Sequence, residues 1–486
     1  MFLSVTFCLI KFFINTQKMD IVQTRFLIYE PERSLTMKKA NVILALVLTF
    51  ILTSPASAQF GFRYTNLELR DLIRRDKLNM YLIPIMQEFN IDCWITLTRD
   101  PNDDMTNVIW DRKIQLDPIV EFIGGEDVKV PAAFIFTVSG ERTAIAAEAD
   151  AKYIRDTGLY KKVLTYTYDR LSGHSGFLAV LEKTVKELNP KTIGLNYSEE
   201  EGVADGLTLG MKNIFDKSVG PDLARRVVSA EKIIISLWNR KVPAEFQLIE
   251  KSARKSAEIT DEALGKVVPG VTTARGIFNY IRARIKEEGM GPAWRESSCP
   301  GVSVGAFRVG APPLDKVVER GDLIVINSGF LLEGHMSDLN KVAYVLKEGE
   351  TDAPEDIKRI FAVGVKAIQA AVSEIKPGAT GQEVDKAGRA VVTSSGCLDY
   401  GHATGHTTGL WVHGLGIILG PPWKSYGEKV NMKIHKDDIY AVELRAAAYS
   451  EQQKANIGIH FQEMVIVEQN GARYLTPPVT ELRLIK

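Results

Sequence analysis

The pattern of apolar and polar positions predicts alternating helices and strands in the first half of the chain. Residues 67–89 carry apolar side chains at helical spacing, and residues 91–97 form a short, mostly apolar run typical of a strand. Residues 132–138 and 142–147 predict two strands joined by a glycine-containing turn, and residues 192–196 predict another strand. This alternation indicates an α/β domain with a mixed sheet.

A long helical stretch, predicted from Pro221 to about Leu237, closes this first region. Pro243 interrupts the helical pattern because proline lacks the N–H donor that a helix interior needs. A further helix is predicted from about Ala244 to Val267. We place a domain boundary between residues 237 and 238.

Two later segments share one pattern. Residues 267–272 and 375–380 each contain Pro-Gly followed by a threonine, and each precedes a helical run that ends near a glycine, Gly289 or Gly396. The threonine suits a helix N-cap, and the glycine suits a helix stop. We interpret the repeat as an old duplication that gives two related helix-and-strand halves; a chance match is the alternative.

Between these segments, residues 321–345 predict two strands with a tight reversal near residues 332–333. Such a turn places Asn327 opposite Asp338 across the ladder.

The last predicted strands, residues 439–445 and 458–467, carry Glu443 and Glu463 among apolar neighbours. A carboxylate buried in a strand is costly and normally needs a partner or a metal ion.

The segment from Tyr400 to Gly416 holds three of the chain's seven histidines, His402, His406 and His413. Its many glycines disfavour a helix and predict looped or extended backbone. In an extended chain His402 and His406 lie on one face and His413 on the other, unless a bend intervenes. Three imidazoles so close together indicate a site for ligation or proton transfer.

Composition narrows the class of protein. Lys+Arg and Asp+Glu both number 60, so the net charge is zero and no basic stripe points to a nucleic-acid partner. The hydrophobic share of 45% is that of a globular protein. Past residue 58 the chain has only three cysteines, Cys93, Cys299 and Cys397. This number excludes a disulfide-rich scaffold, and no two of these cysteines have the spacing of zinc ligands.

The N-terminus contains a secretory pattern. Residues 37–58 combine a charged start, an apolar run and an Ala-Ser-Ala site ahead of Gln59, which predicts a signal peptide. We interpret residues 1–36 as an upstream artefact. The apolar run is shorter than the ~20 residues that span a bilayer. The mature chain is therefore predicted to be exported, periplasmic or secreted, without a membrane span.

The ordered motifs resemble the creatinase/aminopeptidase P branch of the M24 metallopeptidase family. Residues 241–245 (Lys-Val-Pro-Ala-Glu) resemble the Lys-x-Pro-x-Glu that opens its catalytic domain, and Gly405 to His413 resembles its most specific segment. The resemblance implies an α/β (α+β) protein. Residues 59–237 would form a creatinase-like N-terminal domain, and residues 238–486 a pita-bread catalytic-type domain with a duplicated core.

The resemblance also implies a site. The family binds two divalent ions through Asp, Asp, His, Glu and Glu, and the matching positions here are Asn327, Asp338, His406, Glu443 and Gln462. Candidate catalytic or substrate-binding residues are His402, His413 and His460, the last standing where the family has arginine. A further family histidine would fall near Gly310, where the sequence has none.

Two of the five ligand positions are amides, which bring no charge. Two divalent ions carry four positive charges, and only Asp338 and Glu443 remain to balance them. We therefore expect one ion, manganese or zinc, held by Asp338, His406 and Glu443, with Gln462 as a fourth ligand. A register slip that made Glu463 the ligand would turn the strand over.

Three functions compete. The first is an exported hydrolase of the Xaa-Pro aminopeptidase type, which cleaves a peptide C–N bond next to proline. The second is a metal-free, creatinase-like C–N hydrolase with His406 or His413 as general base and Glu443 as the acid that orients it. The third is an inactive binding module. The expected partner is a peptide or small amide substrate, and the resemblance implies a homodimer.

Overall fold

The computed structural model describes residues 64–98, 117–125, 128, 130–168, 175–305, 314–451 and 454–486. The predicted upstream segment 1–36, the predicted signal peptide 37–58 and Gly310 lie outside these residues. By their contacts, residues 61–486 form one compact unit. The predicted boundary after residue 237 falls within helix α10 and stays a prediction. Within the described ranges, no helix has both the length and the apolar character needed to cross a membrane.

A six-stranded sheet organises the N-terminal part, in the order β4-β3-β2-β1-β5-β6. Its strands are β1 (Cys93–Thr98), β2 (Ala132–Thr137), β3 (Arg142–Ala147), β4 (Lys162–Tyr166), β5 (Ile193–Leu195) and β6 (Val227–Ser229). β1 runs antiparallel to β2 and parallel to β5, which confirms the predicted mixed sheet. Trp94 and Ile95 of β1 belong to different hydrophobic cores, because successive side chains point to opposite faces.

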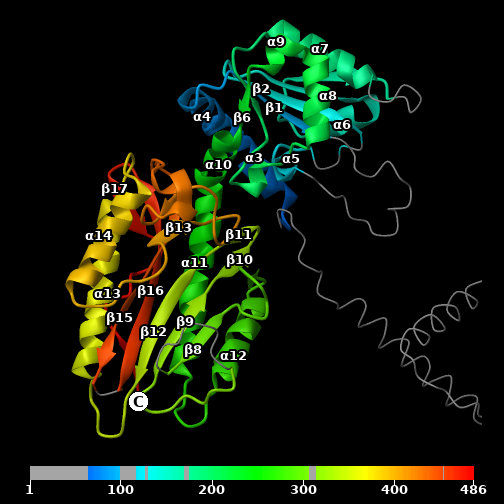
Figure 1. Ribbon diagram of the computed structural model, residues 1–486. Helices are drawn as coiled ribbons and strands as arrows, with labels where there is room; N and C mark the ends of the chain where they lie inside the picture. Colours follow the sequence, from blue (N-terminus) through cyan, green and yellow to red (C-terminus); the bar gives the residue numbers. More distant parts are fainter. Residues whose placement is uncertain are drawn as a thin grey trace, which may run out of the picture. The chain divides into compact units, whose positions relative to one another are not determined.

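Helices pack against both of these cores. They are α3 (Leu67–Met80), α4 (Leu82–Glu88), α5 (Pro118–Phe122), α6 (Glu148–Asp156), α7 (Ser175–Leu188), α8 (Leu209–Val219), α9 (Pro221–Ala224) and α10 (Glu231–Asn239), with a 3₁₀ turn η2 (Gly202–Ala204). α7 and α8 pack against each other beside this sheet (Figure 1). The single helix predicted over residues 221–237 is wrong. Strand β6 interrupts it, since residues 227–229 pair in parallel with the distant β5.

The C-terminal part contains two helix pairs, each packed on a sheet (Figure 1). The helices are α11 (Pro243–Gly265) with α12 (Ala274–Glu287), and α13 (Glu355–Glu374) with α14 (Gly381–Ser394). The first pair packs on the sheet ordered β18-β12-β9-β8, and the second on the sheet ordered β14-β13-β15-β16-β17. β12 contacts β16, which brings the two sheets together. This arrangement confirms the predicted fold class.

The remaining elements are strands and one 3₁₀ segment. The strands are β7 (Gly291–Pro292), β8 (Gly301–Val304), β9 (Leu323–Ser328), β10 (Phe330–Leu332), β11 (His335–Met336), β12 (Leu339–Val345), β13 (Gly405–Thr407), β14 (Ile418–Leu419), β15 (Ile439–Ser450), β16 (Ala455–Glu468), β17 (Gly471–Tyr474) and β18 (Arg483–Ile485). The 3₁₀ segment is η3 (Lys424–Val430). β11, β10 and β7 form a small third sheet.

Local chemistry sets the ends of the repeated helices as predicted. Thr273 caps α12 and Thr380 caps α14, each accepting a hydrogen bond from a backbone N–H of the first turn. Beyond the other ends, Gly289 and Gly396 adopt φ values of 69° and 74°, the left-handed conformation that glycine enters at little cost.

Candidate metal and substrate site

Strands β9, β15 and β16, with the residue directly before β12, supply four of the five predicted ligand positions. Glu443 of β15 pairs directly with Gln462 of β16, so the two side chains share a face of the sheet. Asn327 lies near the end of β9, and Asp338 directly precedes β12. The predicted register of β9 and β12 is wrong by two residues, since Asn327 pairs with Asn340.

The amide of Asn327 joins these strands. Its Nδ2 lies 2.5 Å from Oε1 of Gln462, 2.8 Å from Oδ1 of Asn340 and 3.2 Å from Oδ1 of Asp338. An amide nitrogen can only donate, so it donates to these oxygens with its two hydrogens. Asn340 was not predicted from the sequence as part of this site. Asn340 lies two residues beyond Asp338, which is the spacing of side chains on one face of a strand.

His406 of β13 faces the two carboxylates. Its Nε2 lies 3.7 Å from Oδ2 of Asp338 and 3.8 Å from Oε1 of Glu443. Its Nδ1 donates to the backbone oxygen of Thr407 at 3.1 Å, so Nε2 of the neutral ring carries a lone pair. This Nε2 is buried and has no hydrogen-bond partner among the residues that the structure describes. The ring is therefore oriented to offer Nε2 to a further group.

A bend brings His413 to the same place. Its ring centroid lies 4.6 Å from that of His406, in an edge-to-face arrangement. The exception stated with the extended-chain prediction applies: a bend intervenes, and His413 does not lie on the opposite face. The backbone turns because the N–H of Gly414 donates to the oxygen of Thr407 at 2.6 Å. One ligand atom each from Asp338, His406 and His413 lie within 4.8 Å of one another.

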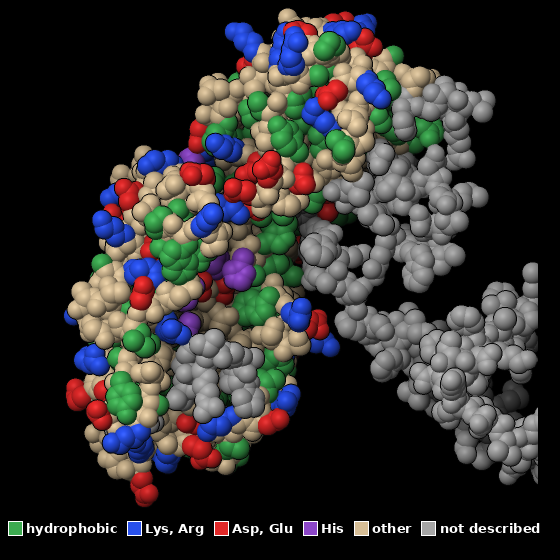
Figure 2. Space-filling view, viewed as in Figure 1, with side chains coloured by type: hydrophobic (Ala, Val, Ile, Leu, Met, Phe, Trp, Pro, Cys, Tyr) green, Lys and Arg blue, Asp and Glu red, His purple; other side chains and the backbone are tan. Residues whose placement is uncertain are grey.

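His402 and His460 form a second imidazole pair. Their rings are nearly parallel, at 10°, with centroids 6.0 Å apart. Nδ1 of His402 donates to the oxygen of Ala403 at 2.7 Å, and its Nε2 is buried with no hydrogen-bond partner in the described part of the chain. Figure 2 shows histidine side chains together with acidic ones in a hollow of the surface. With the proton on Nδ1, the Nε2 atom of the uncharged ring would be a hydrogen-bond acceptor.

Burial shifts the pKa values of Asp338, Glu443 and His406 toward their neutral forms. Burial, helped by the nearby charge of Glu443, raises the pKa of Asp338 to about 8. Burial also raises the pKa of Glu443, and it lowers the pKa of His406 to about 4. A cation placed between them would favour the ionised carboxylates and the free imidazole.

Glu463 stands apart from the site. It pairs with Val442, so it lies on the opposite face of β16 from Gln462. Its Oε1 accepts a hydrogen bond from the N–H of Val479 at 2.7 Å. The slipped register that would make Glu463 a ligand is excluded.

The donor atoms at the five predicted positions carry little negative charge for a metal site. Asp338, His406 and Glu443 offer two carboxylates and one imidazole, enough for a single ion with an open position. The second ion would need charge from positions 327 and 462, which are amides hydrogen-bonded to each other. The structure thus brings together Asn327, Asp338, His406, Glu443 and Gln462; their role as ligands stays a prediction.

The fold defines a class, the pita-bread proteins. Residues 247–469 match the model of metallopeptidase family M24. The chain carries a domain of this peptidase family, which confirms the predicted family and the predicted enzyme class, a peptidase hydrolase.

Individual relatives agree with this assignment. An uncharacterized peptidase of Bacillus subtilis (strain 168) is 23% identical over 359 residues, 73% of this chain and 90% of that protein. The Xaa-Pro dipeptidase of Pyrococcus furiosus is 25% identical over 295 residues, 59% of this chain and 76% of its own length. The crystal structure of X-Pro aminopeptidase from Thermotoga maritima MSB8 aligns with a TM-score of 0.55 and 19% identity, covering 83% of this chain and 100% of that one. The structural likeness supports the fold.

Proposed function

We propose that this protein is an exported hydrolase of the Xaa-Pro aminopeptidase type that works with one divalent ion, manganese or zinc. The observation that carries the proposal is the buried Nε2 of His406, which faces Asp338 and Glu443 at 3.7 and 3.8 Å and lacks a hydrogen-bond partner within the described ranges. The names of the Pyrococcus and Thermotoga relatives support the Xaa-Pro specificity. Residues 37–58 support export.

Each side chain has a defined task in this proposal. Asp338, His406 and Glu443 would hold the ion, with the carbonyl of Gln462 beside them. A divalent ion supplies a Lewis acid and lowers the pKa of bound water. Nε2 of His402 accepts a hydrogen bond from a substrate N–H, since its Nδ1 keeps the proton. His413, at the exposed side of the cluster, binds the substrate or holds a proton for the leaving amine.

Metal content is the decisive measurement. The protein from Gln59 onward, purified without chelator and titrated with Mn²⁺ and Zn²⁺, should bind about one ion per chain. The double variant Asn327→Asp/Gln462→Glu should bind about two, because it restores two carboxylates. Glu463→Gln is the matched control; it removes a carboxylate from the other face of β16 and should leave the stoichiometry unchanged. A wild-type protein that binds no ion would overturn the proposal.

One observation favours a second candidate, the metal-free C–N hydrolase. Nδ2 of Asn327 donates to Oδ1 of Asn340 and to Oε1 of Gln462, so the amides at two of the predicted ligand positions are hydrogen-bonded to each other. Turnover of a small amidino or amide substrate that persists in excess chelator would identify this function. If the protein binds no ion and turns over no substrate, the third function, an inactive binding module, remains.

A further inference from the structure

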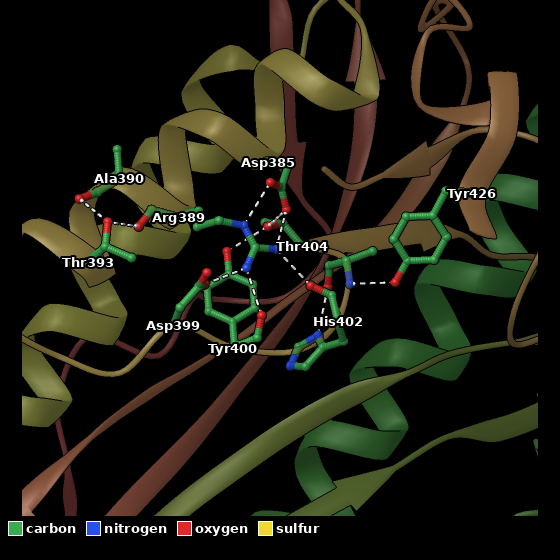
Figure 3. A network of polar contacts seen from close by, with 10 residues as sticks. Asp385, Arg389, Ala390, Thr393, Asp399, Tyr400, His402, Thr404 and Tyr426 are labelled. Carbon is green, nitrogen blue, oxygen red and sulfur yellow. Dashed lines mark hydrogen bonds and ion pairs between the residues drawn. The ribbon is translucent and has the colours of Figure 1, made fainter. Parts of the chain in front are cut away.

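Behind the histidine segment lies a buried ion pair that no part of the proposed reaction uses. It consists of Asp385 and Arg389, one turn apart on α14, whose side chains are 3% and 13% exposed. Nε and Nη2 of Arg389 donate to Oδ2 and Oδ1 of Asp385 at 2.9 and 2.8 Å, a two-point contact. Figure 3 shows this pair beside the backbone that carries His402.

The rest of the guanidinium binds that backbone. Nη2 of Arg389 donates to the oxygen of His402 at 2.8 Å, and Nη1 donates to the oxygen of Tyr400 at 2.7 Å. Nη1 also donates to the carboxylate of Asp399 at 2.6 Å. These contacts use all five N–H groups of an arginine. The guanidinium carbon lies 4.0 Å from the centroid of the Tyr400 ring, which adds a cation–π contact.

Asp385 fixes the next part of the same segment. Oγ1 of Thr404 donates to Oδ1 of Asp385 at 2.6 Å, and the hydroxyl of Tyr400 lies 2.6 Å from Oγ1 of Thr404. The oxygen of Thr404 in turn accepts from the N–H of Glu443 at 2.9 Å, directly before β13 and His406. The ion pair therefore holds the backbone at positions 400, 402 and 404, between His402 and the strand that carries His406.

We propose that Arg389, oriented by Asp385, is a positioning residue that fixes the peptide of His402, so that Nδ1 stays on the oxygen of Ala403 and Nε2 faces the site. Arg389 touches none of the candidate ligands; it acts through the chain that carries them. The expected effect of Arg389 on the rate of peptide cleavage rests on the proposed function. Its expected effect on the orientation of the His402 ring does not.

The test is Arg389→Lys, which keeps the charge and loses the fork that binds two carbonyls and two carboxylates at once. The matched control is Arg284→Lys. Arg284 of α12 also pairs with glutamates, Glu262 at 3.0 Å and Glu287 at 2.7 Å, but lies on another helix pair. Histidine labelled with ¹⁵N reports the ring tautomers by NMR in mildly alkaline buffer, where imidazole is neutral. A His402→Gln variant identifies the His402 signals among the seven histidines.

We expect a fixed Nδ1–H tautomer of His402 in the wild type and in Arg284→Lys, and an averaged one in Arg389→Lys. With Xaa-Pro peptides, kcat of Arg389→Lys should fall about 10- to 100-fold, with KM changed much less. A fixed tautomer with full kcat in Arg389→Lys would overturn the proposal. If the wild type cleaves no peptide, the proposed function fails and the tautomer alone decides the positioning role. If Arg389→Lys does not fold, Asp385→Asn replaces it, because this variant loosens the same two-point contact. The same averaged tautomer and the same fall in kcat are then expected.

Discussion

At the scale of single residues, the amide of Asn327 sets the charge of the candidate site. Its Nδ2 donates to oxygens of Asp338, Asn340 and Gln462. A carboxylate at this position has no hydrogen to give and would stand beside Asp338. In excess chelator, Asn327→Asp should therefore lower the free energy of unfolding by about 1–3 kcal/mol. Added Mn²⁺ should restore it, as measured by urea denaturation.

The control for this change is Asn213→Asp, at an exposed position of α8. It adds the same charge outside the site and should change stability little, with or without Mn²⁺. Equal stability of Asn327→Asp and wild type in chelator would contradict the account of the hydrogen-bonded amides.

Several site residues were predictable because their signals are local. Acids within apolar strands, and histidines among glycines, pointed to Glu443, His406 and His402. Asn340 was missed because a lone amide in a strand has no pattern of its own. The place of His413 could not be predicted, because contacts between distant parts of the chain, such as Met336 N–H to the oxygen of Gly409 at 2.7 Å, set the path of its loop.

At the scale of elements, α13 packs on β16 with a glycine at the contact. A Cβ at Gly364 would lie 2.0 Å from Cε2 of Phe461, the buried neighbour of Gln462. Alanine in a helix normally gains about 0.5–1 kcal/mol over glycine. Overpacking a filled core costs about 1–3 kcal/mol, so Gly364→Ala should reverse the usual sign. We expect lower stability in thermal and urea unfolding.

Gly276→Ala in α12 is the comparison. The nearest atom to its added Cβ is Oγ1 of Thr273, at 3.5 Å, an ordinary contact. This variant should be as stable as the wild type or more stable. A Gly364→Ala protein that gained as much stability as Gly276→Ala would show that α13 can move away from Phe461 without loss.

Apolar spacing and cap residues were enough to predict whether a segment forms a helix or a strand. They did not predict which strand residues pair with each other. The helices after Thr273 and Thr380 were predicted with their caps and stops. The register of β9 and β12 was not, because the reversal centres on Glu333 and Gly334, both with positive φ, one residue later than predicted. A shift of one residue in the turn moves the opposing partner by two.

At the scale of the whole molecule, a buried charge cluster joins the N-terminal helix α3 to the start of α11. Nζ of Lys77 donates to the oxygens of Leu237 and Arg240 at 2.7 and 2.9 Å and lies 3.0 Å from Oε2 of Glu245. Lysine here meets carbonyls at the end of α10 that lack partners within their helix. Oε1 of Glu245 lies 3.2 Å from Nε2 of His335 on β11. Three segments distant in sequence thus meet at Glu245.

This cluster predicts how stability responds to acid. Burial alone would raise the pKa of Glu245, but the charge of Lys77 and the hydrogen bond from His335 outweigh it and hold the pKa at about 2. A pKa lower in the folded state than in the unfolded chain adds stability above about pH 4.5 that is lost as pH falls toward 2.

The test of that contribution is Glu245→Gln, compared with the wild type by urea denaturation across this pH range. At pH 6 the variant should be less stable by about 3 kcal/mol, since removing one partner leaves Lys77 buried and uncompensated. The difference should shrink as the pH falls toward 2, because the wild type then protonates Glu245 and loses the same interaction. Glu258→Gln changes an exposed glutamate of the same helix, paired with Lys255 at 3.0 Å, and should keep the wild-type acid profile. A Glu245→Gln protein whose stability deficit is the same at pH 6 and near pH 2 would show that acid does not act through this cluster, and that other carboxylates set the acid limit of the fold.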